Sequence, residues 1–425
     1  MSDTGLRAIF VTGSLAHGGA ERQSITLMNR LAERRHECHL VHIKRAGTDQ
    51  FDRIRLRHGG SVHCLDAVRY FDRRALAGFA AHISRINPSV ILAANGYALM
   101  YATLAMRLSS RRVPVVATFH SMRLLGAREQ LQMLAYRLCF WLADCAVFVC
   151  ERQRRHWLWR GVCAQKNQVI YNGVDTEEFR DRSGPEDRGR LRSALGFAGT
   201  DYVIGISARL SREKNHVQLV EAVARLRAKG IPARVLMVGD GDMREEIESR
   251  ARELEVADDI VITGFQQDVR PYVAACDAMV LCSHTEAFSL AGIEAMAMGK
   301  PLVHSHVGGA AEMIRPGENG FLFPVGDTAA LVDSLARLAD AGARERMGSQ
   351  ARASVEALFS ETNMVDRYEK LLVSLCRTRP ATGVVVPLTR SATGQTRKGP
   401  TPVTEFPAGW RTPADIHPDH RIHSD

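Results

Sequence analysis

The chain has 425 residues, of which 45% are apolar and 24% charged, and this length and composition suit more than one folded core. No window approaches 18 uninterrupted apolar residues, and the first residues lack a basic start and a long apolar run, so neither a membrane-spanning helix nor a secretory signal is expected. The nine cysteines are scattered without a C-x-x-C pair, which favours reduced thiols in a cytosol over a disulfide framework.

The net charge of +9 is unevenly distributed along the chain. Residues 1–180 contain 26 Lys and Arg against 14 Asp and Glu, whereas the remainder contains 30 against 33. A basic surface suits an anionic membrane, a phosphate-bearing acceptor or nucleic acid. Because the arginines are dispersed and no DNA- or RNA-binding motif accompanies them, nucleic acid is not expected as a partner.

The amino-terminal half alternates between strand and helix patterns. The expected strands are Ala8–Val11, Cys38–Ile43, Val90–Ala93 and Val113–Thr118. The expected helices are residues 21–35, 72–86 and 97–109. Strands separated by helix-length segments indicate a parallel, doubly wound sheet, and such sheets bind ligands beyond the carboxyl ends of their strands.

A glycine-rich turn follows the first strand, with the sequence TGSLAHGGAER from Thr12 to Arg22. Gly18 and Gly19 would let the backbone pass close to a bulky group. The third glycine of the dinucleotide-binding fingerprint is missing, which argues against an NAD oxidoreductase. The alternative interpretation is an ordinary tight turn between a strand and a helix.

His120 follows the run Val115–Phe119, at a predicted carboxyl end of the sheet. A lone histidine is more often structural or simply exposed. Its position at the end of a strand nevertheless favours a role in ligand binding.

Residues 121–142 and 153–160 combine apolar, aromatic and basic side chains. Residues 121–142 are expected to be helical, and the basic and aromatic composition of residues 153–160 suits a membrane interface. The alternative is that both helices pack on the sheet with their arginines in water. The two interpretations can hold for different faces of the same helices.

A change of domain is expected at residues 169–175, where a strand runs into an Asn-Gly turn. Residues 180–193 are polar and are expected to form a loop. A second α/β domain then opens with the strand Val203–Ser207, and Arg209 and Lys214 lie in the loop after it. Arg offers a fork of donors for phosphate oxygens and Lys a mobile point charge, although surface cations usually have no particular role.

The next strand, Val235–Val238, leads into Asp240-Gly-Asp242. These two aspartates resemble a metal-binding D-x-D motif, but no further acidic cluster accompanies them and hard cations usually gather several oxygen ligands. No metal site is therefore expected. Residues 262–265, which include Gly264 and Phe265, follow further along the chain.

The most informative stretch runs from residue 278 to residue 326. A buried strand is expected at Ala278–Cys282, and a helix from near Ser289 to Gly299. The helix start carries small or uncharged residues from Phe288 onward, so its free N–H groups and partial positive charge are available to a phosphate. Glu286 and Glu294 flank this helix start; in isolation the pair would more often be a helix cap and a solvated side chain.

The carboxyl-terminal part is expected to be helical from residue 326 to about residue 339 and over residues 343–376. From residue 377 the composition shifts, with seven of the fifteen prolines in the last 49 residues. Residues 377–425 are therefore predicted to be a disordered tail.

The ordered set of motifs resembles the retaining family-4 glycosyltransferases (glycosyl transferases group 1). The motifs that carry the resemblance are Glu286-x7-Glu294, Gly308-Gly309-x-x-Glu312, the Asn319–Phe323 hairpin, the GGAER segment, the NGVD segment ending at Asp175, and Arg209 with Lys214. The resemblance covers roughly residues 6–376. Ala291, Gly292 and Ala311 depart from the usual pattern, which leaves the donor sugar open.

The resemblance implies a GT-B fold of two Rossmann-like domains facing across a cleft, with the last helix crossing back to the first domain. The implied boundaries are residues 1–172 plus a helix at about 356–376 for the acceptor-side domain, and residues 173–355 for the donor domain. It also implies transfer of a sugar from a nucleoside-diphosphate sugar to an acceptor hydroxyl with retention of configuration, without a metal and with no cofactor besides the donor itself.

The resemblance further assigns roles to individual residues. Arg209, Lys214, Glu286 and His120 would serve catalysis, with the two cations on the diphosphate and Glu286 on the donor sugar. The implied donor-binding residues are Gly18, Gly19, Gly264, Phe265, Phe288, Ser289, Leu290 and Glu294, the last of which would hold the ribose hydroxyls.

The acceptor class follows from the same resemblance, whereas location and membrane contact follow from the scattered cysteines, the missing signal, the basic amino-terminal half and the composition of residues 153–160. The acceptor is expected to be a saccharide or a lipid-linked sugar in polysaccharide, lipopolysaccharide or glycolipid assembly. The protein is expected in the cytoplasm, with peripheral contact to an anionic membrane on its inner face. A nucleotide-sugar epimerase on the same fold and a non-catalytic nucleotide-sugar-binding protein are the alternatives.

Overall fold

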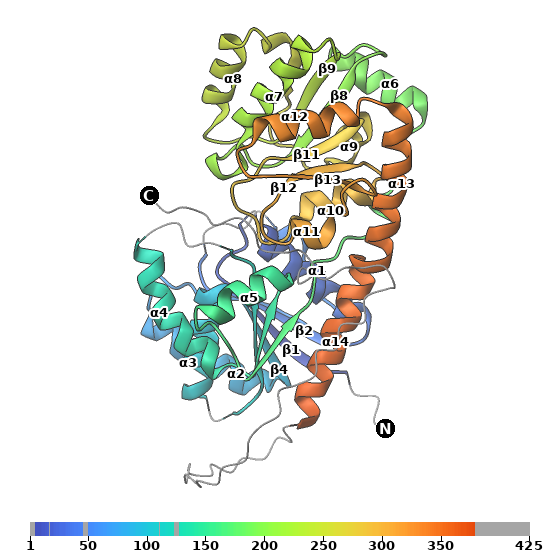
Figure 1. Cartoon of the computed structure of the whole chain (residues 1–425). Coiled ribbons are helices and arrows are strands. Elements are labelled where there is room, and N and C mark those ends of the chain that lie inside the picture. The colour runs from blue at the N-terminus through green and yellow to red at the C-terminus, as the bar shows by residue number, and fades with distance from the viewer. Residues whose placement is uncertain (1–4, 17, 46–49, 110, 123–126, 379–425) are drawn as a thin grey trace, which may run out of the picture. The chain divides into compact units, whose positions relative to one another are not determined.

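The computed structural model describes residues 5–16, 18–45, 50–109, 111–122 and 127–378 (Figure 1). Residues 1–382 form one unit. The tail predicted at residues 377–425 lies outside the described residues, except for its first two positions, which belong to the last helix. Within the described ranges, no helix combines the length and the apolar character needed to cross a membrane. All nine cysteines are free thiols.

A parallel seven-stranded sheet fills the amino-terminal half, in the order β3-β2-β1-β4-β5-β6-β7. Its strands are β1 Arg7–Thr12, β2 Glu37–His42, β3 Val62–Cys64, β4 Val90–Ala94, β5 Val115–Phe119, β6 Cys145–Phe148 and β7 Lys166–Val169. Strands β4, β5 and β6 are buried along their whole length, as expected for a sheet that carries helices on both faces. The strand predicted from residue 169 instead ends there, and β3 and β6 were not predicted.

Helices cover both faces of this sheet. They are α1 Gly19–Glu33, α2 Arg73–Ile86, α3 Asn95–Leu108, α4 Ala127–Leu142 and α5 Glu151–Trp159. Apolar side chains of α2, α3, α4 and α5 share one core cluster, and those of α1 share the cluster on the other face. The local signals are clear at α2, where Asp72 caps the first turn by accepting hydrogen bonds from the N–H groups of Arg74 and Ala75.

A parallel six-stranded sheet follows, in the order β10-β9-β8-β11-β12-β13. Its strands are β8 Tyr202–Ser207, β9 Ala233–Val238, β10 Ile260–Ile262, β11 Ala278–Leu281, β12 Leu302–Ser305 and β13 Gly320–Phe323. The expected hairpin at residues 319–323 is wrong: β13 pairs parallel with β12. A parallel pair needs a crossover, which the segment between residues 306 and 319 provides.

The helices of this second half are α6 Pro185–Ala194, α7 His216–Ala228, α8 Arg244–Glu253, α9 Arg270–Ala275, α10 Leu290–Ala297, α11 Ala310–Met313, α12 Thr328–Arg337 and α13 Ala341–Leu358. Short 3₁₀ turns occur at Phe51–Arg53, Arg212–Lys214 and Ala257–Asp259. The loop expected at residues 180–193 is wrong, because α6 occupies most of it. Pro185 sits in the first turn with Glu186 and Asp187 beside it, which is a helix-start signal that outweighs the polar composition.

The last helix, α14 Glu361–Thr378, returns to the first sheet, as Figure 1 shows. Its buried side chains belong to the core cluster that contains α1 and the strands beneath it; they are Met364, Val365, Tyr368, Leu371, Leu372 and Leu375. The predicted crossing is confirmed, but the crossing helix begins at Glu361, since residues 356–358 still belong to α13.

Candidate functional site

An ion pair between Lys214 and Glu286 joins two loops at the carboxyl edge of the second sheet. Lys214 Nζ lies 2.5 Å from Glu286 Oε2, and both side chains are less than one-fifth exposed. Glu286 Oε2 also accepts a hydrogen bond from Ser283 Oγ at 3.4 Å, and the His284 N–H donates to the Glu213 carbonyl at 2.8 Å. Lys214 and Glu286, both predicted to serve catalysis, are thus held in contact. The charge of each side chain partly offsets the charge of the other.

The loop that carries Glu286 is held from behind by a pair of glycines. Gly308 has a φ of +48°, and a Cβ atom there would lie 1.9 Å from the Glu286 carbonyl oxygen. The Gly309 N–H donates to the Ala287 carbonyl at 2.8 Å, and the thiol of Cys150 donates to the same oxygen at 3.3 Å. Only glycine can occupy a position this close to another backbone segment. The glycine pair therefore holds the Glu286 loop in place.

Arg209 is far more open than Lys214. Its side chain is 75% exposed, and Nη2 lies 3.6 Å from Asp242 Oδ1, which is itself 68% exposed. Such a pair in water holds its members weakly. The guanidinium can therefore leave Asp242 for a stronger anion at little cost.

Helix α10 starts directly after the Glu286 loop. Ser289 is its N-cap, and Ser289 Oγ accepts a hydrogen bond from the Gly292 N–H at 3.2 Å. The N–H groups of Leu290 and Ala291 have no acceptor inside the helix, because the first turn lacks a preceding one. With the partial positive charge of the helix end, this geometry suits an anion.

The glycine turn before α1 meets the start of α10. A Cβ atom at Gly19 would lie 3.3 Å from Leu290 Cδ1, and one at Gly18 would lie 2.3 Å from the Glu21 carboxylate. One turn further along, Arg22 Nη2 pairs with Glu294 Oε1, and Glu294 is buried. Gly19 thus lets the start of α1 lie close to the predicted phosphate-binding helix end, whereas Gly18 makes room for the Glu21 side chain of α1 itself.

Arg22 is a residue whose contact the sequence pattern did not reveal. It lies within the quoted GGAER segment, but its partner is 272 positions away in the chain. A ligand hydroxyl that binds the Glu294 carboxylate must share it with the Arg22 guanidinium.

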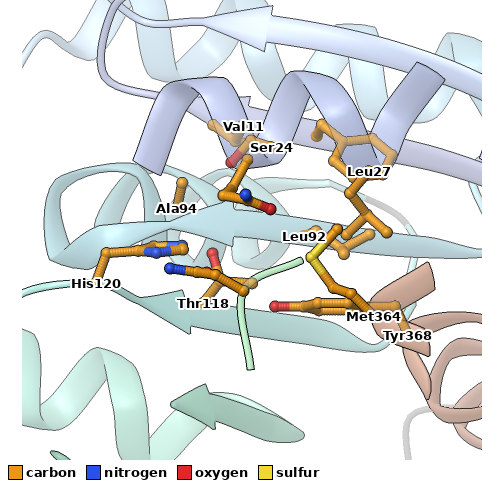
Figure 2. Close-up of a pocket in the computed structure, with 12 residues that line it drawn as sticks. Val11, Ser24, Leu27, Leu92, Ala94, Thr118, His120, Met364 and Tyr368 are labelled. Atoms are coloured by element: carbon orange, nitrogen blue, oxygen red, sulfur yellow. The ribbon is translucent and has the colours of Figure 1, made fainter. Parts of the chain in front are cut away.

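His120 lines a small pocket above the carboxyl ends of β1, β4 and β5 (Figure 2). The backbone N–H of His120 donates to Asn95 Oδ1 at 3.0 Å. Burial lowers the pKa of its imidazole to about 4, so the ring is neutral at pH 7. The pocket also contains Thr118 and Gln23, and it has room for about one water molecule. Gln23 Oε1 is buried and has no hydrogen-bond partner within the described residues, which marks it as an acceptor for that water.

Figure 2 shows His120 and Thr118 at one end of the pocket and Met364 and Tyr368 of α14 at the other. The described contacts do not join His120 to the Lys214–Glu286 pair. Its predicted catalytic role remains a prediction.

The remaining predicted donor-binding residues differ in exposure. Gly264 has a φ of +73° and bridges Gly239, which brings two turns of the second sheet together. Phe265, next to it, is 64% exposed. The ring of Phe288 is buried against Tyr171 and Phe359, so this residue can meet a ligand only through its backbone.

Glu312 is the second residue whose contacts the pattern did not reveal. Its carboxylate accepts hydrogen bonds from the N–H groups of Glu151 and Arg152, each at 2.8 Å, and from the Tyr171 hydroxyl at 2.9 Å. A carboxylate on α11 thus caps the first turn of α5. Burial raises the pKa of Glu312, although its hydrogen-bond donors act in the opposite direction.

The two aspartates of the D-x-D pattern do not gather further acids. Asp240 Oδ2 lies 3.7 Å from Arg244 Nη1, and Asp242 faces Arg209. Over the described ranges, no group of three or more His, Cys, Asp or Glu side chains is arranged to hold a metal ion.

Comparison with known proteins finds two family models, which together cover the second sheet and every strand of the first sheet except β1. The model of glycosyl transferases group 1 matches residues 187–354, and that of glycosyltransferase family 4 matches residues 17–178. N-acetyl-alpha-D-glucosaminyl L-malate synthase of Bacillus anthracis is 28% identical over 373 residues, which cover 85% of this chain and 95% of the relative. The protein named EpsD of Bacillus subtilis strain 168 is 32% identical over 273 residues, which cover 62% and 71%.

Solved structures resemble the fold at lower identity. HepE of Anabaena in complex with UDP superposes with a TM-score of 0.76 at 23% identity, covering 87% of this chain and 100% of that chain. Sucrose-phosphate synthase of Thermosynechococcus elongatus gives a TM-score of 0.73 at 21% identity, covering 88% and 100%.

Proposed function

The chain belongs to the group 1 (family 4) glycosyltransferases of GT-B fold, and we propose that it moves a sugar from a nucleoside-diphosphate sugar to an acceptor hydroxyl with retention of anomeric configuration. One observation carries this proposal: Lys214, in the turn that follows β8, pairs with Glu286 in the loop that runs into the open N-terminus of α10. The fold thus places a cation, 72 positions away in the chain, against the carboxylate whose loop leads into the helix start, and a sugar diphosphate requires groups of these three kinds.

The electrostatic problem in this reaction is the diphosphate, which gains negative charge as the glycosidic bond breaks. In our proposal Arg209 and Lys214 bind its oxygens, together with the N–H groups of Leu290 and Ala291. Arg209 is free to do so because its contact with Asp242 is weak, and Lys214 can turn from Glu286 to the phosphate. Removing a donor of this kind costs roughly 100- to 1,000-fold in kcat, or about 3–4 kcal/mol.

The carboxylates would bind hydroxyls. Glu286 would hold those of the donor sugar, and Glu294 those of the nucleotide ribose, sharing its second oxygen with Arg22. We assign no pair of carboxylates of the glycosidase type, and therefore do not propose a double displacement. We favour front-face attack, in which an oxygen of the leaving phosphate takes the proton of the acceptor hydroxyl. The cations would supply the charge stabilisation that a metal provides in other transferases, and no cofactor besides the donor is proposed.

The acceptor belongs, in our proposal, to polysaccharide, lipopolysaccharide or glycolipid assembly. A relative in Rhizobium meliloti, 30% identical over 202 residues, is a lipopolysaccharide core biosynthesis glycosyltransferase. The solved complexes of HepE with UDP and with UDP-glucose support a nucleoside-diphosphate donor. The proposed location is the cytoplasm, with peripheral contact to the inner face of the cell membrane.

The first experiment is a thermal-shift panel of UDP-, GDP- and ADP-sugars. One nucleotide class should raise the melting temperature, and the shift should shrink in Arg209→Ala and Lys214→Ala. Lys229→Ala is the matched control, because Lys229 pairs with Asp333 on an exposed surface at 3.4 Å. If no nucleotide stabilises the intact protein, the donor assignment is wrong.

The second experiment follows turnover of the donor that stabilises the protein. A glycosylated product formed only when acceptor is added supports transfer, and NMR of its anomeric proton tests retention. Formation of the isomer of the donor sugar without acceptor would contradict transfer and identify an epimerase. Binding without turnover across a panel of saccharide and lipid-linked acceptors would contradict catalysis.

A further inference from the structure

Helix α4 has two apolar faces, and only one of them is buried. Met133, Cys139 and Phe140 are buried in the core beneath the helix. Four large apolar side chains of the same helix are instead exposed to solvent: Leu131 at 70%, Leu134 at 57%, Leu138 at 58% and Trp141 at 66%. We call these four residues the α4 outer face.

The spacing of the α4 outer face places its members side by side. Steps of three, four and three residues return to the same side of a helix, so the four side chains form one stripe. Scattered single apolar residues are normal on a surface, but a contiguous stripe of three leucines and a tryptophan marks a contact site. Figure 1 shows α4 next to α3, at the outer margin of the part that holds the seven-stranded sheet.

The chain around α4 is strongly basic. Residues 107–160 contain ten arginines and only three acidic residues, a net charge of +7 in a protein whose total is +9. Two of the three acids are already engaged: Asp144 accepts from the Val115 N–H, and Glu151 pairs with Arg154. Arginines in this region that are exposed include Arg107, Arg111, Arg112, Arg155 and Arg160.

We propose that the α4 outer face docks on the surface of an anionic bilayer. The leucines and Trp141 would enter the boundary between headgroups and acyl chains, and the surrounding arginines would meet lipid phosphates. An apolar stripe next to a basic surface is the combination that binds a helix in the plane of an anionic membrane. This docking does not depend on the sugar-transfer reaction, so it can be tested separately.

Charge also decides against a second copy of the chain as the occupant. Two copies that meet through α4 would bring two regions of net charge +7 together, and this repulsion opposes association. An anionic lipid surface instead attracts both copies. The charge pattern therefore selects the membrane from the partners that an apolar stripe could serve.

The test is flotation of the full chain with vesicles of phosphatidylcholine alone or with added phosphatidylglycerol, at low and high salt. The intact protein should float with the anionic vesicles at low salt. The Leu134→Gln/Leu138→Gln variant should lose about tenfold or more in partitioning. The matched control is Val325→Gln, which changes an exposed apolar residue (44%) of the other sheet's half and should bind as the intact protein does.

A second variant tests the electrostatic part. Arg111→Gln/Arg112→Gln should weaken binding to anionic vesicles by about tenfold, with little change on phosphatidylcholine. Melting temperatures within about 2 °C of the intact protein would show that all variants fold, since every changed side chain is exposed. The proposal is overturned if the intact protein fails to float at low salt, or if the leucine variant floats equally well. A dimer in solution that the leucine variant dissociates would also overturn it.

Discussion

The contact between Glu312 and helix α5 gives a sharp prediction about stability. Glu312→Ala removes the acceptor of three hydrogen bonds, two from the first turn of α5 and one from Tyr171. Losing a helix N-cap costs about 0.5–2 kcal/mol, and each donor left buried without a partner costs about 1–3 kcal/mol. Because water can reach part of this half-buried site, we expect a total loss of about 3 kcal/mol in the free energy of unfolding.

Glu312→Gln should cost less, about 1 kcal/mol, because the amide oxygen still accepts from the α5 backbone. The pKa direction supports this ranking. Burial holds the pKa of Glu312 above its ordinary value, so the charged form gains little from folding at neutral pH. The stabilisation linked to this titration is present below pH 4.5 and is lost as the pH rises through the raised pKa.

Urea unfolding at pH 7, followed by circular dichroism, measures these costs. Tyr171→Phe is the matched control, since it removes one hydrogen bond and leaves the α5 cap intact, at an expected cost of about 1 kcal/mol. If Glu312→Ala costs no more than Tyr171→Phe, the cap on α5 contributes nothing and the reasoning fails. A double variant of the two positions should be clearly non-additive, because the residues share a bond.

Two further predictions concern a glycine and two histidines. Gly308→Ala places a Cβ atom 1.9 Å from the Glu286 carbonyl oxygen, so we expect a loss of several kcal/mol in stability and a loss of transferase activity. The control is Gly317→Ala, which should cost only about 1 kcal/mol because Gly317 has a φ of +85° but no atom within 4 Å of the added Cβ. Equal losses of stability in the two variants would refute the packing argument. Burial lowers the pKa of His216 and His304 to about 4, so the stability that these neutral histidines contribute should be complete above pH 6.5 and fall toward pH 4. Urea midpoints that stay constant across this pH range would contradict the prediction. A dependence of stability on pH that is unchanged in His216→Leu would also contradict it.

Much of the fold could be predicted because local and global signals agree. Buried apolar runs such as Val115–Phe119 coincide with strands, and residues that cap or stop a helix, such as Ser289 and Gly299, stand where α10 begins and ends. Prediction failed where composition and structure diverge. Helix α6 has no fully buried residue, and β3 spans three half-buried residues, so neither shows the periodicity of a buried face.

The candidate site could be predicted only where its residues are close together in the sequence or follow a recognisable strand. The spacing from Glu286 to Glu294 lies within a single loop and helix, and Lys214 lies in the loop that follows a recognisable strand. The partners of Arg22 and Glu312 lie 272 and about 160 positions away, and no local pattern encodes such distances. The exposure of the α4 outer face also depends on which side of the helix the sheet covers, which the composition alone left open.

The return of α14 to the first sheet has a consequence for synthesis of the chain. The ribosome completes β7 at Val169 but must add just over two hundred residues before Leu372 can pack against α1. At ordinary elongation rates this interval lasts roughly ten to forty seconds. During that time the nascent amino-terminal half exposes the apolar surface that α14 will cover, so newly made chains are expected clients for chaperones until translation reaches the final helix.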